Sequence, residues 1–158
     1  MNKKGFTLVE LLAVIIILGI VVGITYVSVN ANVGNAKKKT EEIFIKTLRD
    51  AVSVYIDSDA SKLSYSSVAC TISKDGKNVN LYRGSNISFR DIVNSTFHPL
   101  AEEDLVNPAN EKTCNASAMA VSIFRDSDYV YYYKIDKSSL DCFETTGYIT
   151  NLPSGSGC

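Results

Sequence analysis

The stretch GFTLVELLAVIIILGIVVGITYVSV, residues 5–29, decides how the rest of the chain is organised. It is a nearly continuous apolar run whose only charged side chain is Glu10, and it comes directly after a short basic head that contains Lys3 and Lys4. A helix of about 24 residues from Phe6 extends about 36 Å, which is enough to cross a hydrocarbon core of about 30 Å. The sequence therefore predicts a membrane-spanning helix at the amino-terminal end.

Length and charge limit the part of the chain beyond this segment. The chain has 158 residues, so the part after the apolar run is long enough for one compact core. The formal net charge is -1, which excludes the broad basic surface that sequence-independent nucleic-acid binding requires. We expect one modest domain behind an anchor, with no direct binding of nucleic acid.

Four cysteines indicate the compartment: Cys70, Cys114, Cys142 and Cys158. All of them lie after the apolar run, and none has the close spacing to a second cysteine or to histidine that a zinc site requires. An even number of cysteines beyond an export-type segment favours two disulfides in an oxidising compartment.

Two common interpretations of the apolar run leave one residue unexplained. A secretory signal peptide would be cut near Ala31, where small residues come after the apolar centre, and an ordinary single-pass anchor would remain uncut. Glu10 fits neither, because an acidic residue at the bilayer centre costs about 2.5 to 3.5 kcal/mol on insertion scales, and less towards the end of a span.

Residues 1–10, MNKKGFTLVE, resemble the processing signature of type IV prepilins and pseudopilins. That signature is a short basic leader ending in Gly, an aromatic first mature residue and Glu at the fifth mature position. The resemblance implies that a membrane-embedded aspartyl peptidase cuts between Gly5 and Phe6 and N-methylates Phe6, and that Glu10 is the assembly glutamate. The implied partners are this prepilin peptidase and methylase, an assembly platform in the inner or cytoplasmic membrane, and further pilin subunits.

A physical argument supports the role of Glu10. Cleavage would create a charged α-amino group on Phe6, and the Glu10 carboxylate of a neighbouring subunit could pair with it. An ion pair at 4 Å gains on the order of 4 kcal/mol at an effective dielectric constant of 20, which is comparable to the insertion cost of the acid. Because Phe6 and Glu10 are four residues apart on one helix, pairing within the same subunit is the alternative.

The helical pattern continues beyond the apolar run. Apolar or small residues recur at spacings of three and four, and charged residues occupy the opposite face. The predicted face comprises Val33, Ala36, Thr40, Ile43, Phe44, Thr47, Leu48, Ala51, Val54 and Tyr55. No proline precedes Pro99, so we predict one helix over residues 6–57, apolar all round in its first half and amphipathic in its second.

Strand patterns dominate the carboxyl third. Residues 118–124 alternate, with Met119, Val121 and Ile123 on one face, and residues 129–136 return as an aromatic-rich strand after a turn. Shorter elements are predicted as strands at 68–72, 79–83 and 147–150 and as a helical turn at 89–95. We therefore predict an α+β fold, in which an antiparallel sheet covers the second half of the long helix.

The predicted organisation has four parts. They are a leader at residues 1–5, the transmembrane and assembly half of the helix at 6–29, its amphipathic half at 30–57, and a globular head at 58–158.

Hairpin geometry ranks the three pairings that four cysteines allow. Cys114 precedes the first carboxyl-terminal strand and Cys142 comes after the second, so antiparallel pairing of the strands would bring them together. Cys70 would then pair with Cys158. The stretch NPANEKTC, the two strands and LDCFETTGYIT also resemble the carboxyl region of Gram-positive pilin-like proteins.

Catalytic and metal-binding patterns are weak. His98 has no neighbouring nucleophile in the sequence, and no phosphate-binding loop or zinc motif is present. Asp126 with Asp128, and the acidic run 102–104, could bind calcium, although solvated turn carboxylates are the preferred interpretation. The tyrosines 129, 131, 132 and 133 could form an adhesive surface, but sheet packing is preferred. We expect no enzymatic activity, no cofactor and no metal.

These patterns and the resemblance together predict a structural subunit of an extracellular type IV pilus, as a major or minor pilin. Before assembly it would be a single-pass membrane protein with a cytoplasmic amino terminus, and afterwards part of a filament at the cell surface. The alternatives are a pseudopilin of a type II secretion or competence DNA-uptake system, and a secreted or anchored ligand-binding domain behind a signal peptide.

Overall fold

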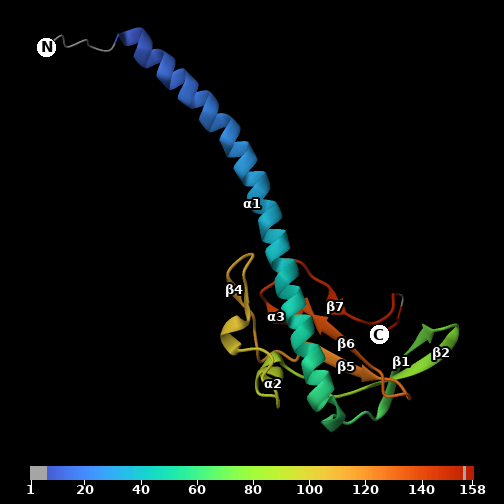
Figure 1. Ribbon diagram of the computed structural model, residues 1–158. Helices are drawn as coiled ribbons and strands as arrows, with labels where there is room; N and C mark the ends of the chain where they lie inside the picture. The colour runs from blue at the N-terminus through green and yellow to red at the C-terminus, as the bar shows by residue number, and fades with distance from the viewer. Residues whose placement is uncertain (1–6, 155) are drawn as a thin grey trace. The chain divides into compact units, whose positions relative to one another are not determined.

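The computed structural model describes residues 7–154 and 156–158, and the side chains of residues 24–31 lie outside the description. The chain divides into two compact units, the first ending at Lys39 and the second being Thr40–Cys158. We call the second unit the head and describe each unit by itself (Figure 1).

Helix α1 is Leu8–Asp59, and it belongs to both units. No proline occurs in it, so no residue inside the helix lacks the backbone N–H group that the helical hydrogen bonds require. The helix ends at Asp59, where the chain tightens into the 3₁₀ turn η1 (Ala60–Lys62). The predicted helix over 6–57 is therefore confirmed to within two residues at each end, with Phe6 outside the described residues.

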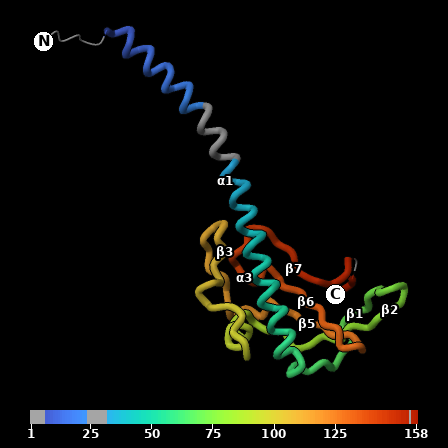
Figure 2. The backbone as a smooth tube through the Cα atoms, viewed as in Figure 1, coloured from blue at the N-terminus to red at the C-terminus, as the bar shows by residue number. Residues whose placement is uncertain are grey.

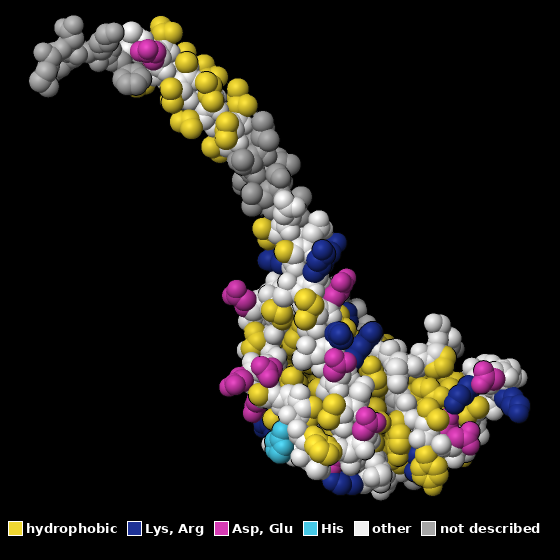
Figure 3. All heavy atoms as spheres, in the orientation of Figure 1, with side chains coloured by type: hydrophobic (Ala, Val, Ile, Leu, Met, Phe, Trp, Pro, Cys, Tyr) yellow, Lys and Arg dark blue, Asp and Glu magenta, His cyan; other side chains and the backbone are white. Residues whose placement is uncertain are grey.

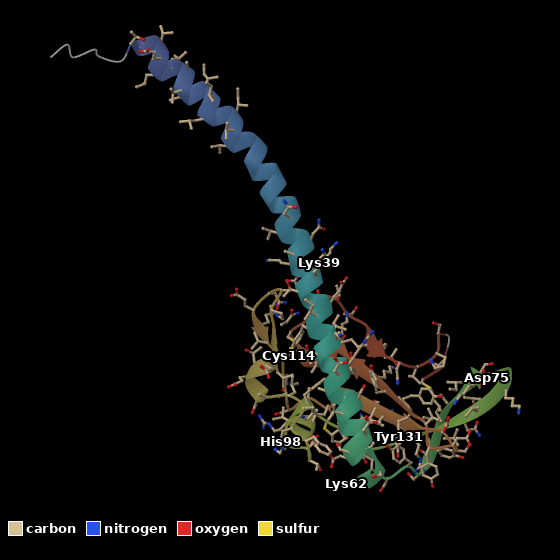
Figure 4. The ribbon with its side chains drawn as sticks, in the orientation of Figure 1. Lys39, Lys62, Asp75, His98, Cys114 and Tyr131 are labelled. Atoms are coloured by element: carbon tan, nitrogen blue, oxygen red, sulfur yellow. A yellow bond between two sulfur atoms is a disulfide. The ribbon has the colours of Figure 1, made fainter. Side chains whose placement is uncertain are left out.

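The main sheet of the head has five antiparallel strands in the order β1-β2-β5-β6-β7. Their bounds are β1 (Ser67–Lys74), β2 (Lys77–Arg83), β5 (Val121–Arg125), β6 (Tyr131–Asp136) and β7 (Tyr148–Thr150). Asp75 and Gly76 form the β1–β2 turn with φ angles of 52° and 74°, as a two-residue hairpin turn requires, and Figure 4 labels Asp75 at its tip.

Smaller elements fill the segment between β2 and β5 and the turn after β6. They are α2 (Phe89–Val93), η2 (Glu102–Asp104), β3 (Val106–Asn107), β4 (Lys112–Thr113) and α3 (Lys137–Leu140). Ser88 and Asp91 form a capping box at the start of α2, which explains why a helical turn forms there. β3 and β4 make a separate two-stranded sheet, which the sequence pattern did not predict.

The core of the head lies between α1 and one face of the sheet (Figures 1 and 2). From α1 it takes the buried residues Phe44, Leu48, Ala51, Val52 and Tyr55, and from the strands Val121, Ile123, Tyr133, Ile135 and Ile149. An antiparallel sheet covering the second half of the helix is the α+β arrangement that the sequence predicted, and it is confirmed.

The predicted helix face was partly wrong. Val52 is fully buried although it was not included, whereas Ile43 is 67% exposed and Val54 37% exposed. Residues 44, 48, 51, 52 and 55 lie along one stripe of the helix, and residues 43, 47 and 54 lie on the flanking stripe. The sheet covers only the first of these stripes, so helical spacing alone predicted a face wider than the buried one.

A second, smaller core lies on the opposite face of the sheet. Ile72, Leu81, Phe124 and Tyr132 are buried there, and Leu152 and Cys158 of the carboxyl-terminal tail pack against them. Phe124 and Tyr132 are adjacent in sequence to Ile123 and Tyr133, so strand alternation sends neighbouring side chains into different cores. Three of the four clustered tyrosines are thus at least half-buried in the sheet, while Tyr129 is 68% exposed.

The strand β6 begins two residues later than predicted. Tyr129 has a φ of 61° and belongs to the turn after β5. Asp126 organises that turn, because its Oδ1 accepts hydrogen bonds from the backbone N–H groups of Asp128 and Val130, at 2.9 and 2.8 Å. Asp126 is only 1% exposed, and its Oδ2 lies 3.5 Å from Nζ of Lys74 on β1. The expectation of a solvated carboxylate at Asp126 was therefore wrong.

Two disulfides fasten the head, with the pairing expected from the sequence. Cys114 is bonded to Cys142, with Cα atoms 4.7 Å apart, inside the main core. Cys70 on β1 is bonded to Cys158, with Cα atoms 5.4 Å apart, and it ties the tail to the sheet. Each bridge restricts the conformations that the unfolded chain can adopt and so lowers its entropy. This typically stabilises a small domain by about 2 to 4 kcal/mol.

The carboxylate of Asp59 connects the end of α1 to the loop after α2. It accepts hydrogen bonds from the backbone N–H of Thr96 at 3.1 Å and from the Thr96 hydroxyl at 2.9 Å, and it pairs with Lys62. The Lys62 ammonium, and after it the Ser58 hydroxyl, hold the pKa of the Asp59 carboxyl well below its usual range, although burial acts in the opposite direction.

The head should lose stability in acid through Asp59. Its folded-state pKa is lower than the value of about 3.9 in an unfolded chain, so its contribution is present above about pH 4 and disappears as the pH falls through the folded pKa. Asp59→Asn should lower the melting temperature at pH 7 and should flatten the acid limb of a stability curve measured by circular dichroism. The exposed neighbour Asp57 provides the control Asp57→Asn, and an acid limb as steep in Asp59→Asn as in the unsubstituted chain would contradict the assignment.

Gly84 is required where β2 meets the Tyr65 ring. A Cβ atom at this position would lie 2.9 Å from Cε1 and 3.2 Å from Cζ of Tyr65. The ring has little freedom to retreat, because its hydroxyl donates to the Ala60 carbonyl at 3.0 Å and the Arg125 guanidinium lies 4.7 Å from its centroid. Gly84→Ala should therefore destabilise the head by about 1 to 3 kcal/mol in urea unfolding. Gly157→Ala, where a Cβ meets open space, is the matched control, and equal stabilities of the two variants would refute the steric argument.

Candidate functional site

The first turn of α1 is closed by a reciprocal pair of side chains. The backbone N–H and the hydroxyl of Thr7 both donate to Oε2 of Glu10 at 2.9 Å, and the Glu10 N–H donates to the Thr7 hydroxyl oxygen at 3.3 Å. The Thr7 carbonyl accepts the first helical bond, from Leu11 N–H at 3.3 Å. This arrangement is a capping box, in which the side chains satisfy backbone donors that the start of a helix leaves open.

The capping box gives Glu10 a fixed position at the positive end of the helix dipole, where a carboxylate is favoured. Thr7 occupies only Oε2, and among the described residues no donor reaches Oε1. A carboxylate accepts up to about four hydrogen bonds, so Glu10 can bind a further cation without leaving the cap. The sequence interpretation missed Thr7, although the T-x-x-E spacing of residues 7–10 is the sequence pattern of a capping box.

The helix surface beyond this first turn is apolar on all sides. Within the first unit, the large apolar side chains between Leu8 and Val22 are 49% to 81% exposed. They are Leu8, Val9, Leu11, Leu12, Val14, Ile15, Ile16, Ile17, Leu18, Ile20, Val21 and Val22. Figure 3 shows hydrophobic side chains covering the visible face of this segment. A soluble helix normally confines such residues to one stripe, so this surface requires apolar surroundings.

We call residues 8–23 the apolar segment. The predicted span of 6–29 also includes Phe6 and side chains that lie outside the described residues. Among the residues that are described, no helix reaches the combination of length and hydropathy required for crossing a membrane.

The two residues expected at the processing site, Gly5 and Phe6, lie outside the described residues, and the structure places only Thr7 and Glu10 of this region. The proposed cut between Gly5 and Phe6 and the N-methylation of Phe6 therefore stay predictions. Glu10 is the one expected site residue of this region that the structure positions.

The other candidate residues do not converge on a second centre of this kind. His98 lies in the loop after α2, with a φ of 45°, and Figure 4 labels it there. Asp126 is engaged in its turn and with Lys74. Across the described part of the chain, no group of three His, Cys, Asp or Glu side chains is placed to hold a metal ion.

Comparison with known protein families identifies a motif at the amino-terminal end. Residues 1–26 match a family model described as the prokaryotic N-terminal methylation motif. No curated protein and no solved structure matches the chain. The matched residues include the capping box and the whole apolar segment, so the motif and the apolar helix surface coincide.

Removing the Thr7 side chain should loosen the first turn of α1. Thr7→Ala deletes two of the three capping-box hydrogen bonds, which typically costs about 1 kcal/mol and should speed amide hydrogen exchange at Glu10 and Leu11 about fivefold. The measurement uses the full chain in detergent micelles. Thr7→Ser keeps the hydroxyl and is the matched control, and identical exchange in the two variants would rule out the cap.

Proposed function

We propose that this chain, which carries the N-terminal methylation motif of type IV pilins and pseudopilins, is a structural subunit of an extracellular type IV pilus. The observation that carries the proposal is that the motif at residues 1–26 coincides with an exposed apolar helix bearing one charged side chain, Glu10. The motif supports a structural role for the chain.

Assembly would depend on one ion pair. Cleavage after Gly5 would make Phe6 the new first residue, and its N-methylated amine would carry a positive charge. The capping box already supplies two donors to Oε2 of Glu10, so Oε1 is the acceptor for the amine of a neighbouring subunit. An isolated carboxylate is costly in apolar surroundings, and a partner amine would remove most of that cost.

The apolar segment would have two successive environments. Before assembly it would lie in the membrane, with the amino terminus in the cytoplasm and the head outside. During assembly the side chains of neighbouring helices would replace the lipid, and close packing would be helped by Gly19 and Gly23, which are spaced as a GxxxG pair. The two disulfides of the head suit an extracellular location, because such bonds persist in oxidising compartments.

This function requires several partners. They are the prepilin peptidase and methylase, an assembly platform in the inner or cytoplasmic membrane, and either identical subunits or other pilins with which the chain would copolymerise. A Gram-positive origin belongs to the same proposal and is supported by the resemblance of residues 107–114 and 140–150 to pilin-like proteins of that type.

A pseudopilin is the second candidate, because the methylation motif is common to both classes. A pseudopilin of a type II secretion or competence DNA-uptake system would build a short structure at the membrane. Electron microscopy of cells that express a tagged chain distinguishes them, since a pilin is found along long surface filaments.

The mature amino terminus tests the family assignment directly. Mass spectrometry of the chain recovered from its native cells should find a first residue of N-methylated Phe6. A chain that starts after Ala31 would instead be the product of a signal peptidase, and the pilin proposal would have to be abandoned.

Substitution of Glu10 tests its role in assembly. Glu10→Ala should leave cleavage after Gly5 intact and should reduce incorporation into sheared filaments at least about tenfold, because the neighbouring amine loses its partner. Glu103→Ala, an exposed acid of the head, is the control for loss of charge alone. Incorporation of Glu10→Ala at the control level would show that Glu10 is not the assembly residue.

A further inference from the structure

A pocket of about 370 Å³ lies on the face of the sheet that does not contact α1. Ser122, Phe124, Lys134 and Asp136 line it, and they alternate along β5 and β6 with residues that face the helix. The carboxyl-terminal tail forms the opposite wall with Gly157 and Cys158. The Cys70–Cys158 bond holds this wall against β1, so the pocket belongs to the folded head.

Two cations on the pocket wall have defined hydrogen-bond partners. Nη2 of Arg83 donates to Oδ1 of Asn86 at 2.8 Å and to Oγ of Ser122 at 3.0 Å. Nζ of Lys134 donates to the main-chain oxygen of Cys158 at 2.6 Å and lies 3.9 Å from the centroid of the Tyr148 ring. Among the described residues, no acidic side chain forms a salt bridge with either cation. Both cations therefore retain donors for an anion.

The third charged group of the pocket is already engaged. Asp136 caps α3, since its Oδ1 accepts from the Ser138 N–H and its Oδ2 from the Ser139 hydroxyl, both at 2.9 Å. Arg83 and Lys134 are the two cationic side chains of the lining, and Asp136 is its one acidic side chain. Asp136 keeps lone pairs that can accept from a neutral hydroxyl.

The uncharged residues of the lining indicate which neutral groups a ligand would need. Ser122 and Asn86 offer polar atoms beside Arg83, while Tyr148 and Met119 are each 59% exposed and present apolar surface at the pocket. A purely apolar ligand would leave the charged groups without hydrogen-bond partners, and a simple ion would leave most of the pocket volume empty. A ligand that complements the cationic, polar and apolar residues of the lining carries one anionic group, several hydroxyls and a compact ring.

We propose that this pocket binds an acidic sugar unit, with its carboxylate on Arg83 and Lys134, its hydroxyls on the polar wall and its ring against Tyr148. The guanidinium and the ammonium would form charge-assisted hydrogen bonds to the carboxylate, which are the strongest contacts available here. The site uses only residues of the head, so it does not depend on whether the chain polymerises.

Binding is tested by isothermal titration of the full chain in detergent micelles with three probes: glucuronate, glucose and acetate. Glucuronate should bind with a dissociation constant in the millimolar range, and glucose and acetate at least about tenfold more weakly, because each lacks one half of the recognised group. Binding of glucose as tight as that of glucuronate would overturn the role of the cations. Binding of acetate as tight as that of glucuronate would reduce the pocket to an anion site and would also overturn the proposal, as would no binding of glucuronate.

Two variants locate the binding, with a third as control. Arg83→Gln and Lys134→Gln should each weaken glucuronate binding about tenfold, whereas Lys77→Gln at the end of the β1–β2 hairpin should leave it unchanged. Glucuronate binding that neither pocket substitution weakens would place it elsewhere. If Lys134→Gln lowers the melting temperature through loss of its bond to the tail, Arg83→Gln and the three-probe comparison still decide the question.

Discussion

The head depends on the burial of one stripe of α1 against one face of the sheet. The helix contributes Phe44, Leu48, Val52 and Tyr55 to this core. They pack against every second residue along β5 and β6. The residues between these positions point to the other face of the sheet. Phe124 and Tyr132 are therefore buried only if another part of the chain packs on that face. The tail and the Cys70–Cys158 bond supply it, and the pocket lined by Arg83 and Lys134 lies along the same tail.

Several carboxylates accept hydrogen bonds from backbone N–H groups, and three of them lie at turning points of the chain. Glu10 closes the first turn of α1, Asp59 binds the Thr96 N–H across the end of the same helix, and Asp126 gathers two N–H groups of the β5–β6 turn. In each case a negative charge satisfies backbone donors that the local geometry leaves open. Glu10 differs from the other two because it lies beside a long apolar surface, where a second charged partner has the largest effect.

One helix thus has two kinds of surface. Between Leu8 and Val22 its large apolar side chains are exposed, whereas from Phe44 to Tyr55 one stripe is buried by the head. The first surface is stable only in lipid or against other helices. This is the physical basis for proposing that contacts with neighbouring helices replace contacts with lipid during assembly. The flanking residues Ile43 and Val54 remain exposed outside the stripe.

Local patterns in the sequence determined the long helix, the strands on either side of the Asp75–Gly76 turn, the β5–β6 hairpin and the α+β class, because helical and strand periodicity act over short distances. They also determined Glu10 as the unusual acid of the apolar run, and the order of the strands was enough to rank the cysteine pairing. Only the tertiary structure decided which stripe of α1 is buried, that Asp126 is buried rather than solvated, and that Arg83 and Lys134 line one pocket. These depend on which distant segments meet, and neither the spacing of residues nor their composition specifies the width of a contact or the path of a tail across a sheet.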